Sequence, residues 1–110
     1  MSVNILPEDA DAALKKMAFI TQEMIQVTEL QTNSIALRHD LGFYSATQAR
    51  DDLYPIYQQA IQEFKARKEE FFQLGSNSLR ELRQLHARLK TETHINMTFL
   101  NGMQRQPEKK

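Results

Sequence analysis

The residues of this chain that could do chemistry are its three histidines and its carboxylates, and their spacing assembles no recognisable site. His86 and His94 are eight positions apart, which is about 12 Å along a helix, so they cannot share a metal ion directly. No His-Glu-x-x-His or Glu-x-x-His pair occurs, so the ligands of a zinc or di-iron bundle are missing. Cysteine is absent as well. We therefore expect no enzyme activity, no metal and no cofactor, with His39, His86 and His94 facing solvent or a partner.

One histidine has neighbours that suggest a specific chemistry. The run from Arg38 through His39, Asp40 and Leu41 to Gly42 distantly resembles the active helix of histidine phosphotransfer domains. In those domains the phosphorylated histidine precedes a Leu-Lys-Gly run, and the lysine charge stabilises the phosphoryl group. Here glycine follows leucine directly and the lysine is missing. Phosphotransfer through His39 is therefore a minor alternative.

Length and charge limit the other function classes. A chain of 110 residues is expected to form one domain with a modest core. No apolar run is long enough to span a bilayer and no export signal is visible, so we expect a cytoplasmic protein without membrane insertion. Residues 76–110 carry seven bases and three acids. This segment has Phe99 as its only aromatic residue, which argues against nucleic-acid binding.

Apolar residues recur with alternating spacings of four and three, which is typical of one face of a helix. This pattern predicts helices over about residues 8–41, 46–74 and 77–103, followed by a flexible tail over 104–110. The predicted fold is all-α, an up-down-up antiparallel three-helix bundle or coiled coil with long helices. The alternative is a helical hairpin in which the second helix continues through Gly75.

Residues that start or stop helices set the predicted boundaries. Pro7 suits the first position of the first helix, and Gly42 suits its end. The second helix should begin between residues 45 and 52, because Pro55 is tolerated only near a first turn. Gly75 should end that helix, and Ser78 with Glu81 can form a capping box for the third.

The first predicted helix is poor in apolar residues along the second half of its inner face. The inner positions there include Gln31, Ser34 and Arg38, and Leu41 closes the series. Burial in this half should therefore fall partly on three neighbouring apolar residues: Leu30, Ile35 and Leu37.

The end of the third helix has an unusual composition. The twelve residues from Thr93 to Gln104, which form its last turns and the first tail residue, contain no charged side chain, although the preceding segment 79–92 carries six charges. A helix turns 100° per residue, so the apolar residues of this end cover more than one face. They exceed what three helices obviously need to bury, which favours a partner-binding surface. The predicted partner-binding residues are Leu85, Leu89, Ile95, Asn96, Met97, Phe99, Leu100 and Met103.

The predicted helices share further residue patterns. The first helix has Glu29 and Leu30 followed by Asn33 and Leu37, and the third has Asn96 before Phe99 and Leu100. The second helix carries the spaced residues Leu53, Tyr57, Ile61 and Phe64, with the basic residue Arg50 near its start. These patterns together resemble the FlgN-type flagellar export chaperones, in which Arg50 loosely matches a basic residue. Glu92 and Thr93 stand where the family's first helix-three asparagine would be.

The resemblance implies a small helical chaperone for flagellar biogenesis by type III secretion. Its client would be a hook-associated or filament-type protein, held soluble through its amphipathic C-terminal helix. The residues leave a second possibility open, namely a structural or regulatory helical bundle that self-associates as a homodimer.

Overall fold

The computed structural model describes residues 3–75 and 77–105, with the side chains of 104 and 105 left aside. Over these residues the chain is helical, with four helices and no strand: α1 (Ala10–Ala36), α2 (Asp40–Ala66), α3 (Lys68–Leu74) and α4 (Asn77–Arg105). The all-helical class is therefore confirmed. The number of helices differs from the prediction because the second predicted helix is divided at Arg67. The predicted tail falls partly in α4, and its residues 106–110 lie outside the described residues.

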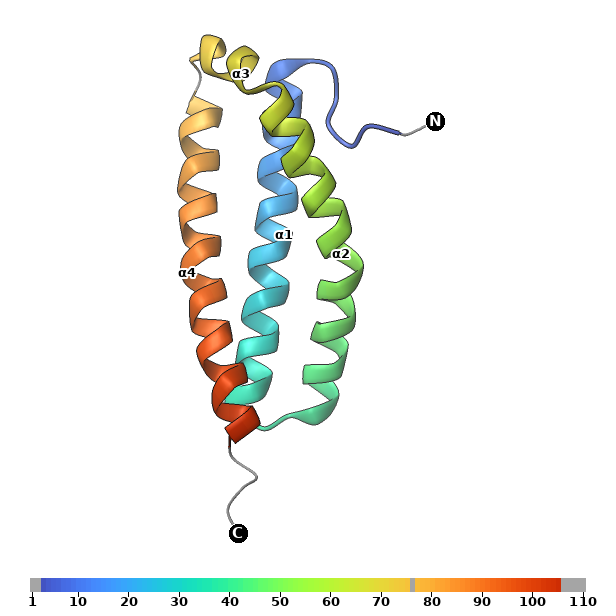
Figure 1. Ribbon diagram of the computed structural model, residues 1–110, viewed down its shortest axis with the longest axis vertical. Coiled ribbons are helices and arrows are strands. Elements are labelled where there is room, and N and C mark those ends of the chain that lie inside the picture. Colours follow the sequence, from blue (N-terminus) through green and yellow to red (C-terminus); the bar gives the residue numbers. More distant parts are fainter. Residues whose placement is uncertain (1–2, 76, 106–110) are drawn as a thin grey trace.

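The three long helices lie side by side along an axis of 58 Å, and α1 packs along both α2 and α4 (Figure 1). α2 runs antiparallel to α1 and α4, and the short α3 crosses one end of the assembly. We call this end the α3 end and the opposite end, where α1 leads into α2, the loop end. The molecule is only 18 Å across its shortest direction, so it is flattened.

Capping residues place the ends of α1 inside the predicted limits. The Asp9 carboxylate accepts a hydrogen bond of 2.9 Å from the amide of Ala12, so Asp9 is the N-cap. Pro7 precedes this cap and does not occupy the first helical position. α1 ends at Ala36, five residues before the predicted end, because Arg38 adopts a left-handed conformation with φ of 55°.

α2 begins at Asp40, earlier than predicted, because His39 serves as its N-cap. The His39 Nδ1 accepts a hydrogen bond of 3.0 Å from the amide of Gly42. A Cβ at position 42 would collide with the His39 ring, so Gly42 allows this cap and does not end a helix. Pro55 then lies inside α2, contrary to the prediction. It lies on the exposed face, where water can solvate the carbonyl of Asp51 that loses its amide donor.

The second predicted helix breaks at Arg67, whose backbone leaves helical geometry at φ −112° and ψ 21°. α3 follows and buries Phe71 against Phe64, with the two rings stacked at a centroid distance of 5.0 Å. Gly75 ends α3 in the left-handed conformation with φ of 57°, as predicted. The chain therefore does not continue through Gly75 as one long helix. Ser78 forms no capping box with Glu81, and its hydroxyl lies 3.3 Å from Asp11 Oδ1.

Residues 3–9 form an irregular segment with bends, held against α2, which we call the N-terminal strap. Three α2 side chains spaced four residues apart hold it: Gln59, Glu63 and Arg67. Gln59 donates to the carbonyl of residue 3, and the Glu63 carboxylate accepts from the amides of residues 5 and 6 at 2.8–3.0 Å. Arg67 donates to the carbonyls of residues 7 and 8 at 2.6 and 2.7 Å. Leu6 is thereby inserted into the interior.

The apolar core occupies the α3 end and the middle of the molecule. Its buried residues come from the strap and all four helices: Leu6, Ala13, Leu14, Met17, Ile20, Met24, Ile25, Ala60, Phe71, Leu79, Leu82 and Leu89. Beyond Ile25 the buried positions of α1 are polar, at Thr28, Gln31 and Thr32. The apolar core therefore ends before the loop end is reached.

Candidate partner-binding surface

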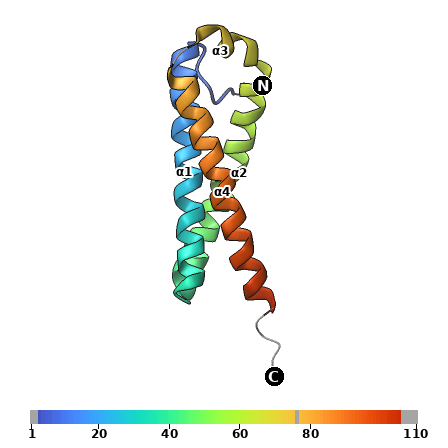
Figure 2. The same ribbon diagram turned by 90° about the vertical axis from the view of Figure 1, so that its left-hand side faces the viewer.

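The last turns of α4 diverge from α1 toward the loop end (Figure 2). The divergence leaves a cleft of about 590 Å³ at this end. We call it the end cleft, and its lining residues come from α1, the α1–α2 loop, α2 and α4: Ser34, Ile35, Ala36, Arg38, Asp40, Phe43, Tyr44, Thr98, Phe99, Gly102 and Met103. Three aromatic rings and two large aliphatic side chains line the cleft together with the polar side chains of Ser34, Arg38, Asp40 and Thr98, so its lining is mixed.

Four of the predicted partner-binding residues lie exposed on the diverging end of α4. Ile95 is 39% exposed, Met97 54%, Phe99 38% and Met103 41%. Leu100 is half-buried. These fractions are large for apolar side chains of this size, and Phe99 and Met103 also line the end cleft.

Three other predicted partner-binding residues are not free on the surface. Leu89 is buried in the apolar core, and Leu85 packs against it half-buried. Asn96 is fully buried, and its Nδ2 donates to Gln31 Oε1 at 3.0 Å and to Thr32 Oγ1 at 2.9 Å. The two leucines and the asparagine lie on the inner face of α4, which packs against α1 and is therefore shielded from solvent.

Asn96 belongs to a cluster of hydrogen-bonded side chains from all three long helices, which we call the polar layer. Gln31 donates to Thr47 Oγ1 at 2.7 Å. Arg50 Nη1 lies 3.4 Å from both Gln31 Oε1 and Asn96 Oδ1. The polar layer consists of Gln31, Thr32, Thr47, Arg50 and Asn96, and it separates the apolar core from the end cleft.

The loop end exposes further apolar side chains that were not predicted as a surface. Leu37 and Leu41 are each 77% exposed, and Tyr44 and Leu30 are also exposed. The expectation that Leu30 and Leu37 would take over burial in α1 is wrong, and Ile35 is only half-buried. Part of the signal was present in the sequence, because the inner face of the first helix has few apolar residues here. The end of α1 before Leu37 was not predicted.

The histidines occupy three different environments. His86 is half-buried, and the edges of Tyr57 and Phe64 approach its ring at centroid distances of 6.4 Å. Burial lowers the pKa of His86, and its Nε2 has no hydrogen-bond partner among the described residues. His86 therefore packs within the bundle and is not a solvated histidine, contrary to that part of the expectation. His94 is exposed, and His39 lies outside the helices as the N-cap of α2.

The described residues contain no group of three or more His, Asp or Glu side chains placed to hold a metal ion. None of the helices in the described part of the chain is long and apolar enough to cross a membrane. Comparison of the chain with protein-family models, with curated proteins and with solved structures gave no match.

Proposed function

We propose that this chain is a protein-binding protein that holds an amphipathic helix of a client in its end cleft. The observation that carries this proposal is the divergence of α4, which leaves Phe99 and Met103 exposed beside Phe43 and Tyr44. A client helix laid into the cleft would bury both its own apolar stripe and these side chains. Area removed from water in this way contributes about 25 cal/mol per Å² of apolar surface.

The FlgN-type chaperones, which the sequence resembles, give this proposal a specific form. The client would be a hook-associated or filament-type protein whose C-terminal helix is kept soluble in the cytoplasm before export. The uncharged turns of α4 at residues 93–103 suit that role, because Phe99 and Met103 offer apolar contacts in the cleft without a fixed charge pattern. The flexible side chain of Met103 can also adapt to different client helices.

The proposal can be tested with labelled peptides that match the C-terminal helices of hook-associated proteins from the source organism. Fluorescence anisotropy should show binding to the wild-type protein and its loss in the double variant Phe99→Ser/Met103→Ser. The thermal unfolding midpoint should change little, because both side chains are about two-fifths exposed. Phe19→Ser is the matched control, since Phe19 is 54% exposed on α1 and does not line the end cleft.

Two results would contradict the proposal. A double variant that loses its stability would show that the end of α4 belongs to the core. A stable double variant that still binds the peptides would place the binding site elsewhere.

Self-association is a second candidate function, favoured by the exposure of Leu37 and Leu41 at the same end. A second copy of the chain could cover these residues together with the end cleft. Light scattering distinguishes the two functions, because a dimer whose population rises with concentration in the absence of peptide favours self-association.

A further inference from the structure

Arg50 differs from Arg67 and Arg88, because it has no carboxylate partner among the described residues. Arg67 and Arg88 each pair with a glutamate at 2.9 Å. Arg50 instead has two long contacts of 3.4 Å from one nitrogen, Nη1, to the amide oxygens of Gln31 and Asn96. A guanidinium has five N–H donors, so most of the donors of Arg50 have no hydrogen-bond partner among the described residues.

Arg50 is half-buried as a residue and can be reached from outside. Together with Asp51, Tyr54 and Pro55 it lines a surface hollow of about 460 Å³. Asp51 borders the same hollow and forms no ion pair with Arg50. The planar fork of a guanidinium favours a bidentate pair with a carboxylate, and this charged pair is stronger than a hydrogen bond between neutral groups.

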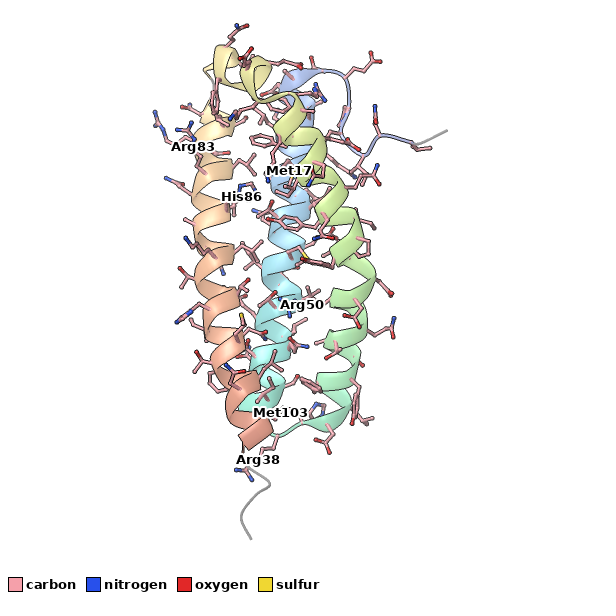
Figure 3. All side chains as sticks on the ribbon, viewed as in Figure 1. Met17, Arg38, Arg50, Arg83, His86 and Met103 are labelled. Carbon is pink, nitrogen blue, oxygen red and sulfur yellow. The ribbon has the colours of Figure 1, made fainter. Side chains whose placement is uncertain are left out.

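The position of Arg50 along the molecule sets a spacing for any partner. Figure 3 shows Arg50 between the level of His86 and the level of Met103, which lies at the loop end. Arg50 contacts Asn96, and Met103 follows Asn96 by seven residues, which corresponds to about 10 Å along α4. A partner helix bound alongside α4 would therefore contact Arg50 and the end cleft with two sets of its own residues. These sets lie about two turns apart on one face of the partner helix.

Resting on the helix-binding function proposed above, we propose that Arg50 recognises a carboxylate on the client helix. The client is then an amphipathic helix with one Asp or Glu on its apolar face, about seven positions from the apolar residues that fill the end cleft. The apolar residues provide most of the buried area. The carboxylate fixes the position of the helix along α4 and discriminates against helices that lack it.

Three synthetic amphipathic peptides test this inference without knowledge of the natural client. Each has about 20 residues, enough for a stable bound helix, with a Leu and Phe stripe interrupted once by Glu, Gln or Lys at the specified spacing. Fluorescence anisotropy should show that wild-type protein binds the Glu peptide about tenfold to a hundredfold more tightly than the Gln peptide. Arg50→Gln should abolish this preference, and Arg50→Glu should bind the Lys peptide best. Arg80→Gln, which removes the same charge from an exposed site on α4, should leave the preference unchanged.

The outcomes separate this inference from the proposed function. If wild-type protein binds the Glu and Gln peptides equally, and Phe99→Ser/Met103→Ser weakens both, helix binding stands and recognition by Arg50 is refuted. This comparison needs no Arg50 variant, so a variant that fails to fold does not affect it. If no peptide binds at about 1 mM, both proposals are overturned. A protein that dimerises and binds no peptide would place a second copy in the cleft, which also overturns the inference.

Discussion

Asn96 on α4 and Gln31 on α1 form a buried hydrogen bond of 3.0 Å between their side-chain amides, at the level where the apolar core ends. Thr32 accepts a second hydrogen bond from the same Asn96 nitrogen at 2.9 Å. A buried polar side chain with partners on one neighbouring helix permits only one alignment of the two helices. The pair therefore fixes how far α4 slides along α1, and with it the position of the end cleft.

Replacing Asn96 with Ala should lower the free energy of unfolding by about 2 kcal/mol, because Gln31 loses a buried partner and a small cavity forms. Chemical denaturation monitored by circular dichroism measures this change. Asn101→Ala is the control, since Asn101 is exposed on the same helix and should change stability by less than about 0.5 kcal/mol. Equal stability of the two variants would show that the polar layer does not stabilise the fold.

His86 should make the protein less stable in mild acid. Burial lowers its pKa in the folded state, whereas the unfolded chain keeps a value of about 6.5. As pH falls below about 6.5, the unfolded state therefore binds a proton that the folded state does not, and stability decreases until the lowered folded pKa is reached. Beyond that point both states are protonated and this contribution no longer changes.

Urea denaturation of wild type and His86→Gln across this pH range tests the role of His86. The variant should lose the part of the pH dependence that arises at this position. His94→Gln provides the control, because His94 is exposed on the same helix and should retain that part. Parallel pH profiles for wild type and His86→Gln would contradict the assignment.

The N-terminal strap should stabilise the α3 end through Leu6 and Glu63. Leu6→Ala should cost about 2–3 kcal/mol, because the side chain is buried in the apolar core. Burial pushes the pKa of Glu63 upward, but hydrogen bonds from the strap amides and from Gln59, with the charge of Arg67, lower it overall. Its stabilising effect is therefore present above about pH 4.3, the unfolded value, and is lost as pH falls through the folded pKa.

Thermal unfolding of Glu63→Gln at neutral pH tests how much the negative charge of Glu63 contributes to holding the strap. The midpoint should fall, because a neutral amide accepts the two strap amides more weakly than a carboxylate does. Glu69→Gln is the matched control, since Glu69 is exposed in α3 and makes no contact with the strap. A drop of the same size in both variants would mean that only the net charge matters.

The His39 cap should contribute to the start of α2. His39→Ala should lower the free energy of unfolding by about 1 kcal/mol, because the amide of Gly42 loses its acceptor. His39→Asn should retain most of the stability, since asparagine is a common N-cap residue. Denaturant titration of both variants measures these changes. Equal losses of unfolding free energy would show that the His39 ring stabilises α2 by packing and not as a cap.

The sequence predicted the helical class, the ending of a helix at Gly75 and the exposure of Phe99 and Met103. It did not predict the break at Arg67, because that break coincides with hydrogen bonds between Arg67 and the strap, which are distant along the chain. The early start of α2 was also missed, since histidine is an uncommon cap and its role depends on Gly42.

The burial of Asn96 had a signal in the sequence that was not used. Gln31 and Asn96 both occupy positions in the apolar stripes of their helices, at the same spacing as leucines and methionines. Two amide side chains at inner positions of neighbouring helices can form hydrogen bonds with each other, so neither is buried without a partner. Spacing alone does not reveal which residues of two helices face each other, so the pairing required the structure.

The change from apolar core to polar layer along α1 divides the molecule by local stability. Backbone amides near Met17 and Leu82 should exchange with deuterium only when the whole protein unfolds, because both side chains are fully buried. Amides of the last turns of α4 should exchange through local fraying, since few buried contacts hold them. A molecule built in this way keeps one end rigid, while the end where we propose that a client binds can adjust to the shape of its partner.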